Sequence, residues 1–141
     1  MNDLHEAGYY ELLSEGEVAC RLCPQRCRIT SGKSGFCKIR TNQGGKLLTT
    51  NYGRISSISL DPIEKKPLSH YYPGKLILSV GTIGCNLACR FCQNWRISRE
   101  EAATQRITPD GLVELADKSR HNEENIGVAY TYSEPGVWYE F

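Results

Sequence analysis

The stretch Lys75–Cys92, KLILSVGTIGCNLACRFC, decides our interpretation of the fold. Its apolar run Leu76–Val80 predicts a β-strand, because the run is short and turn residues, Gly81 and Gly84, follow it. A loop with three cysteines comes directly after the strand: Cys85, Cys89 and Cys92. The sequence therefore predicts a thiol-rich loop at the end of a strand.

Three cysteines this close together favour a metal cluster over buried structural thiols. A cubane iron–sulfur cluster has four irons, so three thiolates leave one iron free to take a substrate or cofactor. A catalytic zinc ion keeps one coordination position open in the same way. Short separations suit a single loop that wraps three corners of the cube, and small or polar residues lie between the thiols: Asn86, Ala88 and Arg90. We predict a [4Fe-4S] cluster on Cys85, Cys89 and Cys92.

The residues after this loop predict a helix and a second strand. Thr108 is a suitable N-cap, Pro109 suits the first helical position, and Asp110 adds an acid to the first turn. An apolar face follows from Leu112 to Ala116, and Ile126–Tyr130 has the composition of a strand. The order strand, loop, helix, strand predicts a parallel, right-handed βαβ unit.

The cysteine run resembles the CxxxCxxC signature of the radical S-adenosylmethionine (SAM) superfamily. Phe91 stands before the last cysteine, as an aromatic residue does in much of that superfamily. The extension Gln93–Trp95 and the block Asp61–Leu68 resemble more narrowly the radical SAM enzyme of the AmmeMemoRadiSam system. That group is described as similar to pyruvate formate-lyase activating enzyme. The resemblance covers Tyr9–Phe141, and the cysteine motif is its most specific part.

This resemblance implies an enzyme that cleaves SAM. SAM would chelate the open iron, and one-electron reduction would release a 5'-deoxyadenosyl radical that abstracts hydrogen from a substrate. Phe91 would lie near the adenine, although an aromatic residue beside a cluster also excludes water. Glu134, followed by Pro135, would meet the amino group of SAM. A carboxylate at a strand end can hold an ammonium by a charge-assisted bond, but Tyr132 and Ser133 replace the two glycines of the family pattern.

The resemblance also implies the fold class, α/β, with residues 75–141 as the first βα units of a partial (β/α) radical SAM barrel. A closed barrel needs about 250 residues, whereas this chain has 141 and ends on the apolar segment Gly136–Phe141. We therefore expect a truncated barrel in an N-terminal fragment. Alone, such a fragment is expected to bind a cluster at most partially and to show no turnover.

Residues 1–74 predict a small β-rich module with a second metal site, made by four cysteines: Cys20, Cys23, Cys27 and Cys37. Gly32, Gly35 and Pro24 supply the tight turns that such a site needs. Four thiolates could close a tetrahedral zinc site or hold a second iron–sulfur cluster, and both remain open. Four unrelated buried thiols are the third alternative.

Short strands are expected in this module near residues 9–13 and 17–20. Residues 46–51 and 54–60 predict a hairpin around Tyr52-Gly53, and residues 61–74 a proline-rich connector. Its charged side chains predict a solvated ion-pair network: Asp61, Glu64, Lys65 and Lys66.

Composition places the chain in a reducing compartment. Seven cysteines without an apolar leader argue against a secreted disulfide framework, and no run reaches the ~20 apolar residues of a membrane span. We expect a soluble, cytoplasmic protein whose partners are SAM, a reductant such as flavodoxin or ferredoxin, and a protein substrate of the glycyl-radical kind. Residues 18–60 are basic and contain no acid. We interpret that charge as balance for metal thiolates rather than as a nucleic-acid surface, since stacking aromatics are few.

Two other classes of function fit the same residues. A non-catalytic iron–sulfur electron-transfer module would have a fourth ligand to the Cys85 cluster and would not respond to SAM. A zinc-dependent nucleic-acid-binding protein would hold zinc at both sites and bind DNA or RNA in a salt-sensitive way.

Overall fold

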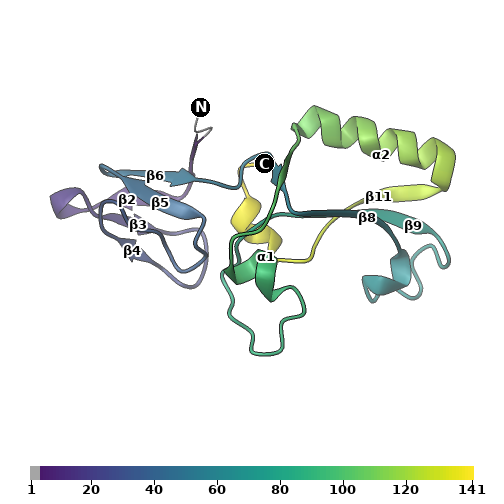
Figure 1. Cartoon of the computed structure of the whole chain (residues 1–141), viewed down its shortest axis with the longest axis horizontal. Coiled ribbons are helices and arrows are strands. Elements are labelled where there is room, and N and C mark those ends of the chain that lie inside the picture. The colour runs from purple at the N-terminus through teal and green to yellow at the C-terminus, as the bar shows by residue number, and fades with distance from the viewer. Residues whose placement is uncertain (1–3) are drawn as a thin grey trace.

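The computed structural model describes residues 4–141, without the side chain of Glu123; residues 1–3 of the predicted N-terminal module lie outside it. The described chain forms four small β-sheets and two α-helices (Figure 1). Strands β1 to β6 occupy one end of the molecule, and a sheet covered by α2 occupies the other. The C-terminal turn lies between these two ends.

The N-terminal end consists of two antiparallel sheets. One has the order β1-β6-β5 and the other β2-β3-β4. The bounds are His5–Glu6 for β1, Tyr10–Leu12 for β2, Val18–Cys20 for β3, Arg28–Ile29 for β4, Arg40–Gln43 for β5 and Lys46–Thr49 for β6. The short strands expected near residues 9–13 and 17–20 are confirmed as β2 and β3.

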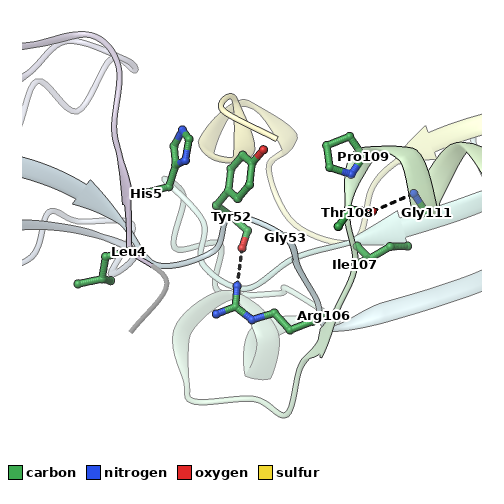
Figure 2. Close-up of a pocket in the computed structure, with 9 residues that line it drawn as sticks. All are labelled: Leu4, His5, Tyr52, Gly53, Arg106, Ile107, Thr108, Pro109 and Gly111. Atoms are coloured by element: carbon green, nitrogen blue, oxygen red, sulfur yellow. Dashed lines mark hydrogen bonds between the residues drawn. The ribbon is translucent and has the colours of Figure 1, made fainter. Parts of the chain in front are cut away.

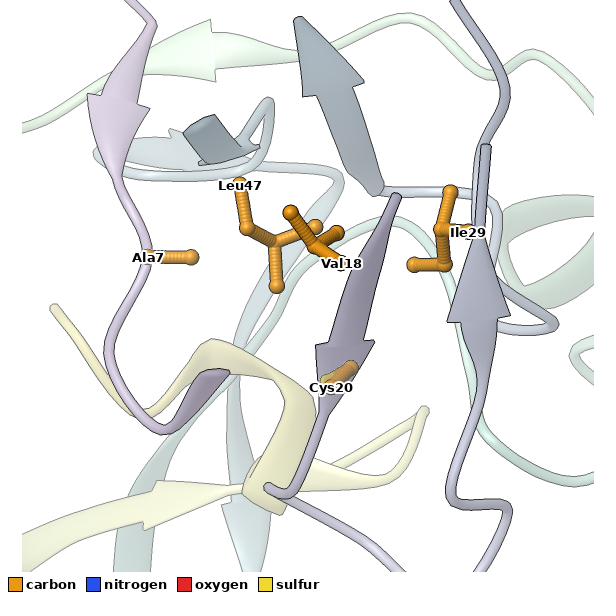
Figure 3. Close-up of a cluster of buried hydrophobic side chains, with 5 residues drawn as sticks. All are labelled: Ala7, Val18, Cys20, Ile29 and Leu47. Carbon is orange, nitrogen blue, oxygen red and sulfur yellow. The ribbon is translucent and has the colours of Figure 1, made fainter. Parts of the chain in front are cut away.

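A small apolar core joins these two sheets (Figure 3). Val18 and Leu47 are fully buried at its centre, which stabilises the fold by about 1.5 to 3 kcal/mol for each side chain. The other buried members are Ala7, Cys20 and Ile29. Cys20 is therefore held by packing before any metal is considered.

The sheet at the other end carries the predicted βαβ unit. Its order is β11-β9-β8, with β8 at Ser57–Pro62, β9 at Leu76–Gly81 and β11 at Asn125–Tyr130. β9 and β11 run parallel, and the helix α2, Pro109–Glu123, connects back to β11 over the sheet. The Thr108 hydroxyl accepts a 3.0 Å hydrogen bond from the amide of Gly111, so the predicted N-cap and the strand, helix, strand order are confirmed.

The predicted α/β barrel is wrong. Of the four sheets in the described chain, three are wholly antiparallel, and in the fourth the one parallel pair has an antiparallel neighbour. β8 pairs antiparallel along the whole of β9, from Ser57 opposite Gly81 to Pro62 opposite Leu76. One edge of β9 is therefore taken by an antiparallel strand, whereas the strands of a (β/α) barrel are parallel to their neighbours.

The predicted hairpin of residues 46–51 and 54–60 is also wrong. β6 pairs instead with β5, and β8 pairs with β9. Between them, β7 (Arg54–Ile55) pairs antiparallel with β10 (Gln105–Arg106). Tyr52-Gly53 is therefore a link between sheets and not a hairpin turn.

Short helical segments complete the fold: the 3₁₀ helices η1 (Ser14–Gly16), η2 (Ile63–Lys65) and η3 (Pro135–Trp138), and the α-helix α1 (Trp95–Arg99). η3 docks the C-terminal segment, because Val137 and Trp138 are buried and the Trp138 ring stacks on Phe141 at 4.5 Å. Glu140 accepts hydrogen bonds from the buried guanidinium of Arg40 and, at 2.9 Å, from the amide of Gly8. None of the described helices has the length and apolar character needed to cross a bilayer.

Candidate functional site

The three cysteines of the motif line one pocket together with Glu134. The pocket has a volume of about 210 Å³. The cysteines come from the loop after β9, and Glu134 comes from the loop after β11. The remaining lining residues are Leu87, Ala88, Ser98, Arg99, Tyr132 and Ser133. The structure thus brings together four of the five residues predicted for the cluster and SAM.

Parallel pairing of β9 and β11 explains why these two loops meet. The carboxyl ends of parallel strands lie at the same edge of a sheet, and here the amide of Thr131 donates a 2.8 Å hydrogen bond to the Val80 carbonyl. Beyond the strand ends, the Ser133 hydroxyl lies 3.1 Å from the Thr82 carbonyl and donates to it. A side chain on Gly81 would lie 2.7 Å from the Thr131 carbonyl, so only glycine permits this approach.

The three thiols differ in exposure. Cys85 is buried, Cys92 is half-buried and Cys89 is exposed. The amide of Leu87 lies 3.4 Å from the Cys85 sulfur and donates to it, which orients that thiol. The loop of Cys89 and Cys92 projects from the body of the molecule below α1 (Figure 1). One thiol is therefore anchored in the fold, while the other two are carried on an exposed loop.

Phe91 does not line this pocket. Its side chain is 87% exposed, and its contact with adenine stays a prediction. Trp95, at the start of α1, is half-exposed, and the Arg96 guanidinium lies 5.4 Å from its ring centre. Glu134 is half-buried and accepts a 3.2 Å hydrogen bond from the amide of Gly136, so its carboxylate caps η3 at the pocket wall.

A buried carboxylate that the sequence pattern does not reveal supports the same pocket. Asp61, predicted to be solvated, is 4% exposed and accepts bonds of 2.9 Å from Lys65, 2.9 Å from Lys66 and 2.8 Å from the Tyr132 phenol. Burial raises the pKa of Asp61, but these hydrogen bonds outweigh burial and hold the pKa well below its usual range. Burial and the Asp61 bond raise the pKa of Tyr132.

The contacts of Asp61 hold Tyr132, two residues before Glu134, in an unusual backbone conformation. Tyr132 has a φ of +70°, a left-handed conformation that glycine adopts without strain and tyrosine does not. Its phenol bond to Asp61 and the Lys66 ammonium 5.1 Å from its ring centre hold the side chain in place. No local sequence signal reveals this contact, because the alternation of apolar residues in β8 places Asp61 on the same side of the strand as Ser57 and Ser59.

The N-terminal cysteines line a second, much smaller cavity of about 10 Å³. All four take part: Cys20, Cys23, Cys27 and Cys37. The amide of Phe36 lies 3.4 Å from the Cys27 sulfur and donates to it, and burial raises the pKa of the Cys37 thiol. Within residues 4–141, no three His, Cys, Asp or Glu side chains are gathered closely enough to hold one metal ion. Metal binding would therefore draw the sulfurs inward at either site.

Direct contacts join the two cysteine groups. The Arg99 guanidinium donates 3.1 Å hydrogen bonds to the Phe36 carbonyl and to the Cys85 carbonyl, and it lies 4.5 Å from the Phe36 ring centre. On the other side of the contact, the Gln25 side-chain amide donates a 2.9 Å bond to the Asn86 carbonyl. The loop of Cys85 therefore rests on the segment that carries Cys27 and Cys37.

A wider pocket of about 790 Å³ lies away from both cysteine groups (Figure 2). Its lining comes from the β1 region, the Tyr52-Gly53 link and the start of α2. His5 stacks on Tyr52 at 4.2 Å, and the Arg106 guanidinium donates a 3.0 Å bond to the Tyr52 carbonyl. Its described lining contains no pair of catalytic acids or thiols, so we assign no chemistry to it.

Acidic neighbours offset much of the basic charge of residues 18–60. Arg21, Arg28 and Lys46 form ion pairs with acids from the segment before β3, namely Glu11, Glu17 and Glu6. Arg40 is buried against Glu140. The basic stretch of the sequence is therefore not a continuous unpaired cationic surface.

A comparison with known proteins found a relative that is similar in sequence to this chain. The chain is 44% identical over 141 residues to the uncharacterized protein MJ0808 of Methanocaldococcus jannaschii. The match covers 98% of this chain, and the chain spans 41% of the length of that relative. No family model matches the chain, and no solved structure matches it.

Proposed function

We propose that this chain holds the cluster site of a radical SAM enzyme. Cys85, Cys89 and Cys92 would bind a [4Fe-4S] cluster, and Glu134 would bind the ammonium group of SAM. One observation carries the proposal: the three thiols and the carboxylate line a single pocket where two parallel strands end. When bound, the cluster and SAM would supply reductive cleavage of SAM and hydrogen abstraction from a substrate.

The chain's own groups suit these roles. Three thiolates leave one iron of a cube without a protein ligand, and a carboxylate beside that position attracts an ammonium by a charge-assisted hydrogen bond. The Ser98 hydroxyl lines the same pocket, is buried, and has no hydrogen-bond partner among the described residues. A buried polar atom without a partner is costly, so this hydroxyl is a donor suited to a cluster sulfur or to the carboxylate of SAM.

The exposed loop suits electron transfer from a reductant and access by a substrate. Cys89 is exposed, which would bring one edge of a cluster close to an electron donor of the flavodoxin or ferredoxin class. The same exposure leaves the pocket open to a large substrate, and a glycyl-radical protein fits that requirement. A nucleic-acid partner is less well supported, because half of the basic side chains of residues 18–60 form ion pairs with acids.

Anaerobic reconstitution of the chain with iron and sulfide tests the proposal. We expect iron and sulfide in equal amounts, at most four of each per chain, bound through the Cys85 loop, and an electron paramagnetic resonance spectrum of the reduced cluster that changes when SAM is added. Cys89→Ser should lose this cluster. Phe91→Ala, an exposed residue of the same loop, serves as the matched control and should keep it.

Two outcomes would replace the proposal with another function. A reduced spectrum that is unchanged by SAM, with a fourth protein ligand on the cluster, would indicate an electron-transfer module. Zinc in place of iron at the Cys85 loop, with salt-sensitive binding of DNA or RNA, would indicate a nucleic-acid-binding protein.

A further inference from the structure

The cavity between the four N-terminal cysteines is very small. Its volume of about 10 Å³ compares with the ~10–15 Å³ that a single water needs when measured with a water-sized probe. Apart from the four cysteines, its lining consists of Leu22, Gln25, Ile29, Gly35, Arg40 and Val137. Space of this size accepts one atom.

A cavity of this size can hold a single metal ion but not an iron–sulfur cluster. A cubane cluster brings eight inorganic atoms, and a two-iron cluster brings four. The walls that would have to open for them, Ile29 and Val137, are each buried in a core. Gly35 is equally confined, because a side chain there would lie 3.1 Å from Ile29 and 3.5 Å from the Cys27 sulfur. One ion at the usual Zn–S distance of ~2.3 Å needs only inward movement of the thiols.

A buried cation beside the cavity suits a metal–thiolate complex of net negative charge. Arg40 is 1% exposed and lines the cavity, and its Nε atom is buried without a hydrogen-bond partner. Glu140 balances the charge of Arg40 but accepts at the terminal nitrogen and leaves Nε unused. Four thiolates around a divalent ion carry a net charge of −2, which would give the spare N–H group of Arg40 an anionic partner.

The segment around this cavity also supports the loop of the candidate cluster. Gly84, next to Cys85, has a φ of +82°, and a side chain there would lie 2.5 Å from Ile39 and 2.8 Å from the Cys37 carbonyl. Gln25, between two of the four cysteines, donates to the carbonyl of Asn86. Both neighbours of Cys85 therefore contact the N-terminal cysteine segment.

We propose that Cys20, Cys23, Cys27 and Cys37 bind one tetrahedral zinc ion, and that this ion fixes the surface on which the Cys85 loop rests. Binding exchanges four thiol protons for the ion and involves no change of oxidation state, so it needs no reductant or oxidant. The site is structural, since four protein ligands leave no open coordination position. The metal assignment stands independently of the function proposed above.

Metal analysis of a variant that lacks the other cysteine group tests the assignment. The triple variant Cys85→Ser, Cys89→Ser, Cys92→Ser should still bind one zinc per chain, and cobalt in its place should give the visible absorption of a tetrahedral thiolate site. Adding Cys37→Ser should remove both signals. Iron with sulfide in the triple variant, an absence of bound metal, or retention of zinc after Cys37→Ser would each overturn the assignment.

Hydrogen exchange tests the link between the two sites without relying on a variant that must fold. Removing zinc from the unsubstituted chain with a chelator should increase amide exchange at residues 84–87, and adding zinc alone should restore protection. The β9–β11 pair serves as the internal control, and its protection should not change. Unchanged exchange at residues 84–87 would overturn the supporting role, whereas a lack of response to SAM would affect only the proposed enzyme function.

Discussion

The Tyr132 phenol donates a 2.8 Å hydrogen bond to the carboxylate of Asp61, 71 residues earlier in the chain. Tyr132 also lines the pocket of the three cysteines, and it does so with a left-handed backbone. The contact therefore connects a buried charge at the end of β8 to the loop that carries Glu134. It gives a structural reason for a tyrosine where the resembled family has glycine.

Replacing Tyr132 with phenylalanine should lower the free energy of unfolding by about 1.5 to 3 kcal/mol, because it removes a hydrogen bond to a buried, charged acceptor. Urea denaturation followed by circular dichroism measures the change. Tyr71→Phe is the matched control, since that side chain is half-exposed, and it should change the stability by less than about 0.5 kcal/mol. Equal stabilities of the two variants would show that the Asp61 bond contributes nothing.

Asp61 should make the fold sensitive to acid. Hydrogen bonds from Lys65, Lys66 and Tyr132 overcome burial and hold the pKa of Asp61 below its unfolded value of about 3.9. The folded state therefore binds fewer protons, so this contribution to stability is present above about pH 4 and is lost as the pH falls toward the folded pKa. We call the fall in the free energy of unfolding with decreasing pH the acid limb. Asp61→Asn should make the acid limb less steep in urea titrations between about pH 6 and about pH 3.

Glu124→Gln provides the comparison for this acid limb. Its hydrogen bond with Lys75 also lowers the pKa of Glu124, but that pair lies at the surface and is screened by solvent. We expect the acid limb of the Glu124 variant to follow that of the unsubstituted chain. If the acid limb of Asp61→Asn were as steep as that of the unsubstituted chain, the acid sensitivity would come from other carboxylates.

Gly84→Ala should disturb both cysteine sites at once. The left-handed φ costs about 1 to 2 kcal/mol with any side chain, and the clash with Ile39 and the Cys37 carbonyl should add about 1 to 3 kcal/mol. Gly74→Ala isolates the first cost, because Gly74 has a φ of +78° and open space around it. Thermal unfolding of the two variants should therefore differ, and equal melting temperatures would contradict the close packing of the two segments.

Local signals in the sequence predicted the elements that frame the candidate site, because an apolar run or a helix cap spans only a few residues. The apolar run ending at Gly81 is β9, and the Thr108 cap begins α2. Strand partners are not local, so neither the pairing of β8 with β9 nor the antiparallel character of the sheets could be foreseen. The partial barrel was inferred from the family resemblance and not from residues that pair.

The same distinction explains which site residues were predicted. Cys85, Cys89 and Cys92 are close in sequence, and their spacing alone favours a shared site. Asp61 was assigned to a solvated network because its burial depends on Tyr132, far along the chain. Phe91 was placed near a cofactor by resemblance, whereas its side chain is exposed in the structure. Contacts between distant segments carry the information that the sequence pattern lacks.

Glu134→Gln should weaken SAM binding about tenfold, which corresponds to about 1.4 kcal/mol, because it removes the negative charge facing the ammonium group. Glutamine keeps an acceptor for the Gly136 amide, so the cap of η3 and the fold should be retained. SAM titration of the reconstituted, reduced chain, followed by electron paramagnetic resonance, measures the change. Glu101→Gln removes an exposed charge beyond α1 and should leave the affinity unaltered. An identical affinity in the Glu134 and Glu101 variants would remove Glu134 from the proposed site, while the cysteine loop would remain to be judged by its own cluster signal.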